Sequence, residues 1–151
     1  MNTKIFPRIY RSDIFYVDFG RQPGSVIHGI RPAMVAQNDV GNWHSPTLIV
    51  AAITAEIQKL RQPTHVLIRK QFGLAHESML MLEQLATIDK TALLTYVGTA
   101  SSEFLEAVDK ALSVSVGTHR MVQKINHYGL QRKRTGRNRR RRYRGLKSKF
   151  L

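Results

Sequence analysis

The sequence predicts a mainly β fold, a small barrel with helices packed outside it. Two observations support this class. Five short segments with alternating or wholly apolar strand patterns come first, separated by glycine and proline, and helical patterns follow them. The length of 151 residues, 42% of them hydrophobic, suits one domain with a core and is too short for two domains of ordinary size.

The positive charge is concentrated at the C-terminus. Residues 1–118 hold 11 Lys and Arg against 10 Asp and Glu, whereas residues 119–151 hold 13 basic residues and no acidic residue. A segment with so little apolar surface does not fold unaided. We therefore expect a barrel domain over residues 1–118 and a flexible basic tail over residues 119–151. The tail would contact RNA, DNA or the ribosome without sequence preference, or it would simply be solvated.

Several classes of protein are excluded or disfavoured by composition. The chain has no cysteine, so it has no disulfide framework, thiol nucleophile or thiolate metal site. Neither a long apolar run nor a signal-peptide core is present, and we expect a cytoplasmic protein without membrane contact. His44, His65 and His76 lack the spacing of a metal pair. We expect no metal and no cofactor, and His65 is most simply a surface residue.

The first strand is expected at residues 14–19, where apolar and polar side chains alternate. Residues 20–29 carry three glycines and a proline without periodicity, which indicates a long loop, either functional or a disordered hairpin tip. Pro32 favours extended backbone at Arg31. Residues 29–39 are thus expected to bring Arg31 to the mouth of the barrel by a loop, with the second strand at residues 33–38.

A turn is expected at residues 38–42, and the central strand follows it at Thr47–Thr54. This strand is apolar on both faces, including Ile49, as is typical of a strand covered on both sides. Thr54 ends it beside the position expected for Arg31.

The fourth and fifth strands are expected at residues 64–69 and 79–83. A short helix is expected after Thr87, with Asp89 in its first turn. Residues 101–116 have the clearest amphipathic helical pattern of the chain.

Four motifs in order then point to a family. GIRPAMVAQND at 29–39, SPTLIVAAIT at 45–54, PTHVLI at 63–68 and LEQLATIDK at 82–90 resemble those of the MazF/PemK toxins of bacterial toxin–antitoxin systems. The resemblance runs from about residue 11 to residue 116. It implies an SH3-like barrel of the MazF/PemK/CcdB type that forms a homodimer. It also implies metal-independent cleavage of single-stranded RNA at short sequences, silenced by a cognate antitoxin protein.

The resemblance also assigns the site. It places the catalytic pair on Arg31 and Thr54, and it places RNA-binding or supporting roles on Ser25 and Gln84. The chemistry agrees, because RNA supplies its own 2′-hydroxyl nucleophile and a planar guanidinium matches two phosphate oxygens. Thr54 can orient the phosphate but is a poor base. His28, three residues from Arg31, is either a general base or an RNA-binding side chain.

Departures from the family pattern keep other functions open. Val26 and Ile27 stand where polar loop residues are usual, and Ala86 stands where an arginine is common. One alternative is a non-catalytic nucleic-acid-binding or regulatory barrel anchored by the basic tail. Another is a poison of DNA gyrase on the same fold, because fold does not determine function.

Overall fold

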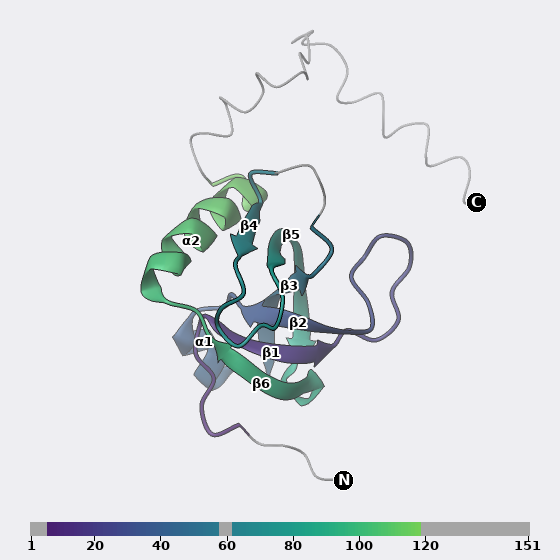
Figure 1. The fold of residues 1–151 in the computed structure, drawn as a ribbon. Helices are drawn as coiled ribbons and strands as arrows, with labels where there is room; N and C mark the ends of the chain where they lie inside the picture. Colours follow the sequence, from purple (N-terminus) through teal and green to yellow (C-terminus); the bar gives the residue numbers. More distant parts are fainter. Residues whose placement is uncertain (1–5, 58–61, 119–151) are drawn as a thin grey trace, which may run out of the picture. The chain divides into compact units, whose positions relative to one another are not determined.

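The computed structural model describes residues 6–57 and 62–118. The expected tail at 119–151 lies outside these residues, so the domain boundary at 118 stays a prediction. Within the described ranges no helix has both the length and the apolar character needed to cross a membrane. The elements are β1 (Asp13–Asp18), β2 (Ile30–Val35), α1 (Asp39–His44), β3 (Thr47–Thr54), β4 (His65–Ile68), β5 (Ser78–Asp89), η1 (Lys90–Ala92), β6 (Leu93–Thr99) and α2 (Ser102–Val116) (Figure 1).

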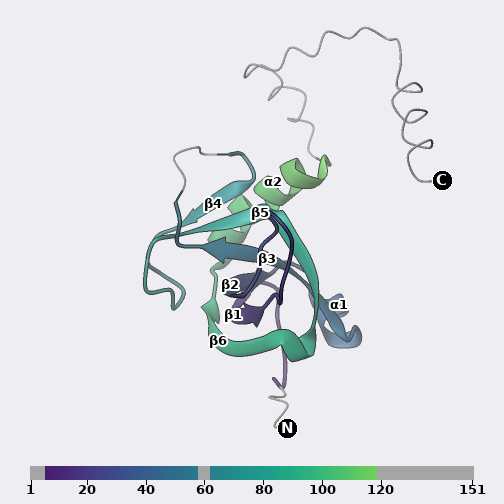
Figure 2. The same ribbon diagram turned by 90° about the vertical axis from the view of Figure 1, so that its right-hand side faces the viewer.

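The strands form one antiparallel sheet in the order β4-β5-β3-β2-β1-β6. In the described part of the chain β4 and β6 are the two edges and do not pair, so the curled sheet stays open (Figure 2). The mainly β fold with a C-terminal amphipathic helix is confirmed.

The sheet has an apolar core on each face. The inner core contains Phe15, Val17, Val35, Val50 and Ala52, among others. The helix-side core contains Ile14, Met34, Ala51 and Ile53 together with Val108 and Ala111 of α2. Successive side chains of a strand point to opposite faces. The wholly apolar pattern of β3 therefore supplies both cores, as expected for a central strand.

Ile49 is the exception on β3, because 40% of its surface is exposed to solvent. The expectation that this side chain is covered is wrong for the described chain. The helix α2 packs mainly against β4 and β5 and leaves this end of β3 uncovered.

The turn after β4 packs against the other edge of the sheet. A Cβ atom on Gly73 would lie 2.0 Å from the carbonyl oxygen of Val97, and one on Gly98 would lie 2.1 Å from the carbonyl oxygen of Phe72. Only glycine permits so close an approach of two backbones. The two edges of the sheet are thus linked by packing.

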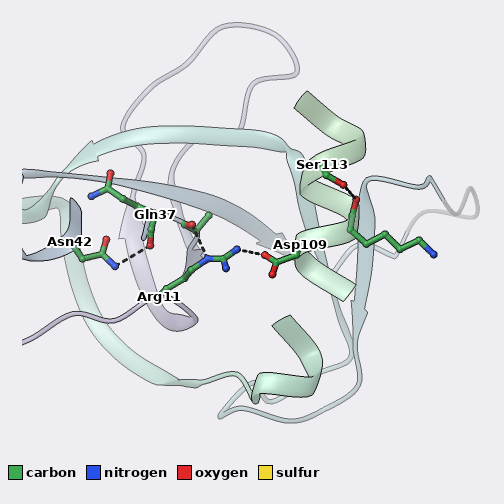
Figure 3. A network of polar contacts seen from close by, with 7 residues as sticks. Arg11, Gln37, Asn42, Asp109 and Ser113 are labelled. Atoms are coloured by element: carbon green, nitrogen blue, oxygen red, sulfur yellow. Dashed lines mark hydrogen bonds and ion pairs between the residues drawn. The ribbon is translucent and has the colours of Figure 1, made fainter. Parts of the chain in front are cut away.

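Arg11 connects the segment before β1 to the helix α2. Its Nε donates to the carbonyl oxygen of Ala36 at 3.1 Å, and its Nη2 lies 2.5 Å from Oδ1 of Asp109 on α2. Figure 3 shows the side chain of Arg11 reaching across to Asp109. Its backbone N–H also donates to Oδ1 of Asp39, at the start of α1. One residue therefore contacts both α-helices of the described chain.

The second strand begins earlier than expected. Arg31 and Pro32 lie within β2, so the expectation that a loop carries Arg31 is wrong. Pro32 is tolerated because the pairing of β2 with β3 starts only at Ala33, where Ala33 faces Ala52. The turn expected at 38–42 is instead the helix α1, with Asn38 as its N-cap.

The short helix expected after Thr87 is also wrong. Residues 85–89 of β5 pair with residues 47–51 of β3, so the strand continues to Asp89. Only the single 3-10 turn η1 follows, capped by the side chain of Asp89, which accepts from the backbone N–H of Thr91 at 2.8 Å. The strand β6 then adds a sixth strand to the five expected.

Candidate active site

Strand register brings Arg31 and Thr54 together. Ala33 of β2 faces Ala52 of β3, and two further residues along these antiparallel strands place Arg31 opposite Thr54. Both positions lie on the face of the inner core, because side chains two apart on a strand share a face. Each lies near the end of its strand, beyond the last pair between β2 and β3, where the core gives way to solvent.

A cavity of about 460 Å³ opens at this end of the sheet. It contains four of the five site residues expected from the sequence, whereas His28 is not part of its lining. The lining residues are Ser25, Ile27, Arg31, Thr54, Glu56, Gln62, His65, Met79, Met81, Glu83 and Gln84.

The local contacts of the central pair leave donors available. The backbone N–H of Glu56 donates to Oγ1 of Thr54 at 3.1 Å, which orients the hydroxyl and leaves its own proton for an acceptor in the cavity. Nε of Arg31 makes a long contact of 3.4 Å with the carbonyl oxygen of His28. The two terminal nitrogens of the guanidinium are thereby the groups suited to a two-point contact with a phosphate.

Gln84 positions the loop that contains Ser25. Its Nε2 donates to the carbonyl oxygen of Ser25 at 3.1 Å, and its Oε1 accepts from the backbone N–H of Ile27 at 3.3 Å. The pairing of β3 with β5 jumps from Ala51–Leu85 to Ala52–Met81, so Gln84 lies in an irregular stretch of β5. Such bulges redirect side chains beside functional sites.

The loop 20–29 is closed at its base by backbone hydrogen bonds. The N–H of Phe19 donates to the carbonyl oxygen of Gly29 at 2.9 Å. The N–H of Gly29 donates in turn to the carbonyl oxygen of Gly20 at 2.8 Å. His28 is exposed near this base, with Nδ1 3.0 Å from the carbonyl oxygen of Val26. It is held by its own loop, outside the cavity.

His65 is the site residue that the sequence interpretation missed. Its Nε2 lies 2.6 Å from Oε1 of Glu83, and its side chain is only 11% exposed. The expectation of a surface histidine is wrong because β4 pairs with β5, and Met81 faces both His65 on β4 and Ala52 on β3. His65 lies in the motif PTHVLI and Glu83 in LEQLATIDK, so the pairing of these two segments was the signal.

No group of three or more potential metal-ligating His, Cys, Asp or Glu residues occurs in the ranges 6–57 and 62–118. The cavity side chains with ionisable groups are Arg31, Glu56, His65 and Glu83. The site can therefore offer a phosphate-binding cation, a hydroxyl donor and an imidazole paired with a carboxylate.

The fold of this chain is similar to that of solved endoribonucleases and MazF toxins. An endoribonuclease in complex with its cognate antitoxin from a Mycobacterial species matches with a TM-score of 0.62 at 19% identity, covering 74% of this chain and 97% of that one. MazF from Deinococcus radiodurans matches with a TM-score of 0.63 at 17% identity, covering 73% and 97%. The fold is that of the MazF toxins.

Sequence comparison then defines the family. Residues 10–116 match the family described as PemK-like, MazF-like toxin of type II toxin-antitoxin system. Endoribonuclease EndoA of Bacillus subtilis (strain 168) is 45% identical over 109 residues, which cover 72% of this chain and 94% of that protein. The chain belongs to the PemK-like, MazF-like toxin family, and the resemblance found in its motifs is confirmed.

Proposed function

We propose that this protein is the toxin of a toxin–antitoxin pair and acts as an endoribonuclease on single-stranded RNA at short sequences. Its family membership and its 45% identity to Endoribonuclease EndoA support this activity. The observation that carries the mechanism is that Arg31 and Thr54, far apart in sequence, line one cavity.

The reaction requires little from the protein besides positioning and charge stabilisation. The 2′-hydroxyl beside the scissile phosphate attacks phosphorus, and the products are a 2′,3′-cyclic or 3′ phosphate and a 5′-hydroxyl. Arg31 binds the phosphoryl oxygens where negative charge develops. Thr54 donates its hydroxyl proton to one of those oxygens, since its Oγ1 already accepts from Glu56.

Ser25 and Gln84 would contact the RNA or support the loop that does. Ser25 is exposed at the cavity, and Gln84 holds its carbonyl oxygen. His28 would contact RNA from outside the cavity, at the base of the same loop.

The apolar loop residues do not require a loss of chemistry. Ile27 packs against the inner core, so its hydrophobic side chain anchors the loop. Arg31 and Thr54 remain beside it in the same cavity. The cavity thus favours the nuclease over a non-catalytic binding protein.

The partners follow from the same assignment. We infer a cytoplasmic homodimer that is silenced by a cognate antitoxin, as MazF of Deinococcus radiodurans was solved together with MazE. The basic tail, outside the described residues, would add contacts to nucleic acid that do not depend on sequence.

Mapping of RNA ends tests the proposal. Purified protein is incubated with a long single-stranded RNA in excess chelator, and the fragments are mapped. We expect discrete cuts with 5′-hydroxyl ends, reduced at least about 100-fold in Arg31→Ala, because removing a preorganised donor has effects of this size. Thr54→Ala should also lose the cuts.

Matched controls are Arg69→Ala and Thr95→Ala, which change exposed residues outside the cavity lining and should leave the cuts unchanged. RNA that is bound but uncut, and released by salt, would show a binding protein instead. Cuts that disappear in chelator would refute metal independence.

A further inference from the structure

We infer that His65, held by Glu83, is the general base that takes the proton from the attacking 2′-hydroxyl. This inference deepens the proposed ribonuclease function and rests on it. Arg31 and Thr54 can bind the phosphate, but a guanidinium and an alcohol are poor proton acceptors near neutral pH. The cavity contains one imidazole, the side chain best suited to that task.

Strand pairing places His65 on the face that carries Arg31 and Thr54. His65 of β4 faces Met81 of β5, and Met81 faces Ala52 of β3. Residues in such a row share a face of the sheet, and Thr54 is two residues beyond Ala52 on the same face. With strands about 4.8 Å apart, His65 lies about two strand spacings across from Ala52, and Thr54 lies two residues further along β3, which makes the backbone separation of His65 and Thr54 about 12 Å. A ribose and its phosphate fit between side chains that extend from both positions.

Glu83 determines which nitrogen of His65 is available. Nε2 is 2.6 Å from Oε1 of Glu83, so the carboxylate accepts the Nε2 proton of the neutral ring. Within the described residues Nδ1 makes no hydrogen bond, and it is the basic nitrogen that remains for the substrate. A carboxylate in this position also stabilises the imidazolium formed when the ring accepts a proton.

Other charged groups around the cavity are compatible with this role. Arg31 on β2 is the cation that faces the phosphate, and Glu56 after β3 is the second carboxylate of the lining. Glu56 is exposed, and its backbone N–H contacts Thr54. The carboxylate of Glu83 is the one in contact with His65, so Glu83 is a positioning residue.

The proton-transfer step balances within the RNA, His65 and water. The 2′ oxygen forms a bond to phosphorus as its proton passes to Nδ1 of His65, and the bond from phosphorus to the 5′ oxygen breaks. The 5′ oxygen takes a proton from water. The products are the 2′,3′-cyclic phosphate and the 5′-hydroxyl, and His65 returns its proton to solvent.

The test measures single-turnover cleavage across pH at a site mapped with the wild-type protein, with chelator present. We expect His65→Gln, which keeps a donor toward Glu83, to be slower by about 100-fold or more and to lose the acid limb of the wild-type rate profile. Glu83→Gln should be slowed less and should keep the acid limb, because its imidazole is still present and only the carboxylate that positions it is lost. The control His76→Gln changes an exposed histidine outside the cavity and should match wild type.

Two further measurements separate a base from other roles. Affinity for RNA with a 2′-deoxy nucleotide at the cut should be equal in wild type and His65→Gln, whereas a loss confined to affinity would make His65 a binding residue and overturn the inference. A substrate with sulfur in place of the 5′ bridging oxygen has a leaving group that needs no proton. If that substrate restores the rate of His65→Gln, His65 is the acid and not the base.

The same cleavage assay distinguishes the role of His65 from the ribonuclease activity itself. Cleavage by wild type that is lost in Arg31→Ala, with His65→Gln as fast as wild type, refutes the role of His65 alone. Absence of cleavage by wild type refutes both.

Discussion

The side chain of Gln84 and the backbone of Ser25 are joined by a hydrogen bond of 3.1 Å that links β5 to the loop 20–29. A second bond, from the N–H of Ile27 to Oε1 of Gln84, holds the same loop at 3.3 Å. One amide thereby determines where the loop lies over the cavity.

Gln84→Ala should weaken RNA binding more than it slows chemistry. Each of the two hydrogen bonds contributes about 1 kcal/mol, and 1.4 kcal/mol is a factor of ten, so KM for RNA should rise about 30-fold with little change in kcat. Steady-state cleavage of an oligonucleotide checks this, with Gln71→Ala in an exposed turn as control. A fall in kcat at constant KM would instead place Gln84 in contact with the reacting phosphate.

Arg11→Ala should destabilise the fold more than Asp109→Ala. Asp109 is 57% exposed, and exposed ion pairs contribute about 0.2–1 kcal/mol. Loss of Arg11 also leaves the carbonyl oxygen of Ala36 without its donor, for a total of about 1–2 kcal/mol. Urea unfolding measures both, with Lys110→Ala as the neighbouring control on α2. Equal losses for the two variants would contradict the contribution of Ala36.

Gly73→Ala and Gly98→Ala should both be strongly destabilising. The added methyl group would lie 2.0 or 2.1 Å from a carbonyl oxygen, so the two backbones would have to separate. Gly24 has positive φ, as Gly73 does, but has open space around it, and the free energy of unfolding of Gly24→Ala should fall by only about 1 kcal/mol. Thermal unfolding should show a much larger loss at positions 73 and 98. Similar losses in Gly73→Ala and Gly24→Ala would mean that backbone conformation, and not close packing, accounts for the effect at Gly73.

Glu103 should make stability depend on acid. Its own backbone N–H, and then the side chain of Ser101, donate to the carboxylate and lower the pKa of Glu103 below its ordinary value of about 4.3. A carboxyl whose pKa is lower in the folded state stabilises the fold above that ordinary value, and the contribution is lost as pH falls through the folded-state pKa.

The stability of wild type should accordingly fall more steeply than that of Glu103→Gln as pH is lowered from about 6 to about 3. Urea unfolding at each pH measures the difference, and Glu106→Gln, one turn further along α2, is the control. Parallel curves for wild type and Glu103→Gln would refute the contribution of this group.

The sequence predicted the elements whose pattern reflects their own burial. Thr47–Thr54 has its predicted bounds because this strand supplies both cores, and α2 begins within one residue of the prediction, with Ser101 as N-cap. The site pair Arg31 and Thr54 was found through motifs, and the register of β2 with β3 accounts for its placement.

The predictions from sequence are wrong where the structure of a segment depends on a strand that is distant in the sequence. Thr87 and Asp89 favour a helix start locally, yet they belong to β5 because β3 offers a pairing edge there. Residues 38–42 predict a turn because they contain Gly41, a poor helix former, yet Asn38 caps α1 and the others belong to it. The sequence predicts a surface position for His65 because alternation on one strand does not reveal what the neighbouring strand brings beside it.

The closed base of the loop 20–29 makes the position of the strand ends independent of the side chains at the loop tip. Two backbone hydrogen bonds tie the strand ends together whatever side chains the tip carries. Substitutions between them can accumulate without shifting β1 against β2, and Arg31 stays in place while they do. Under the proposed function, the loop tip can therefore change its contacts with RNA while the position of Arg31 is kept.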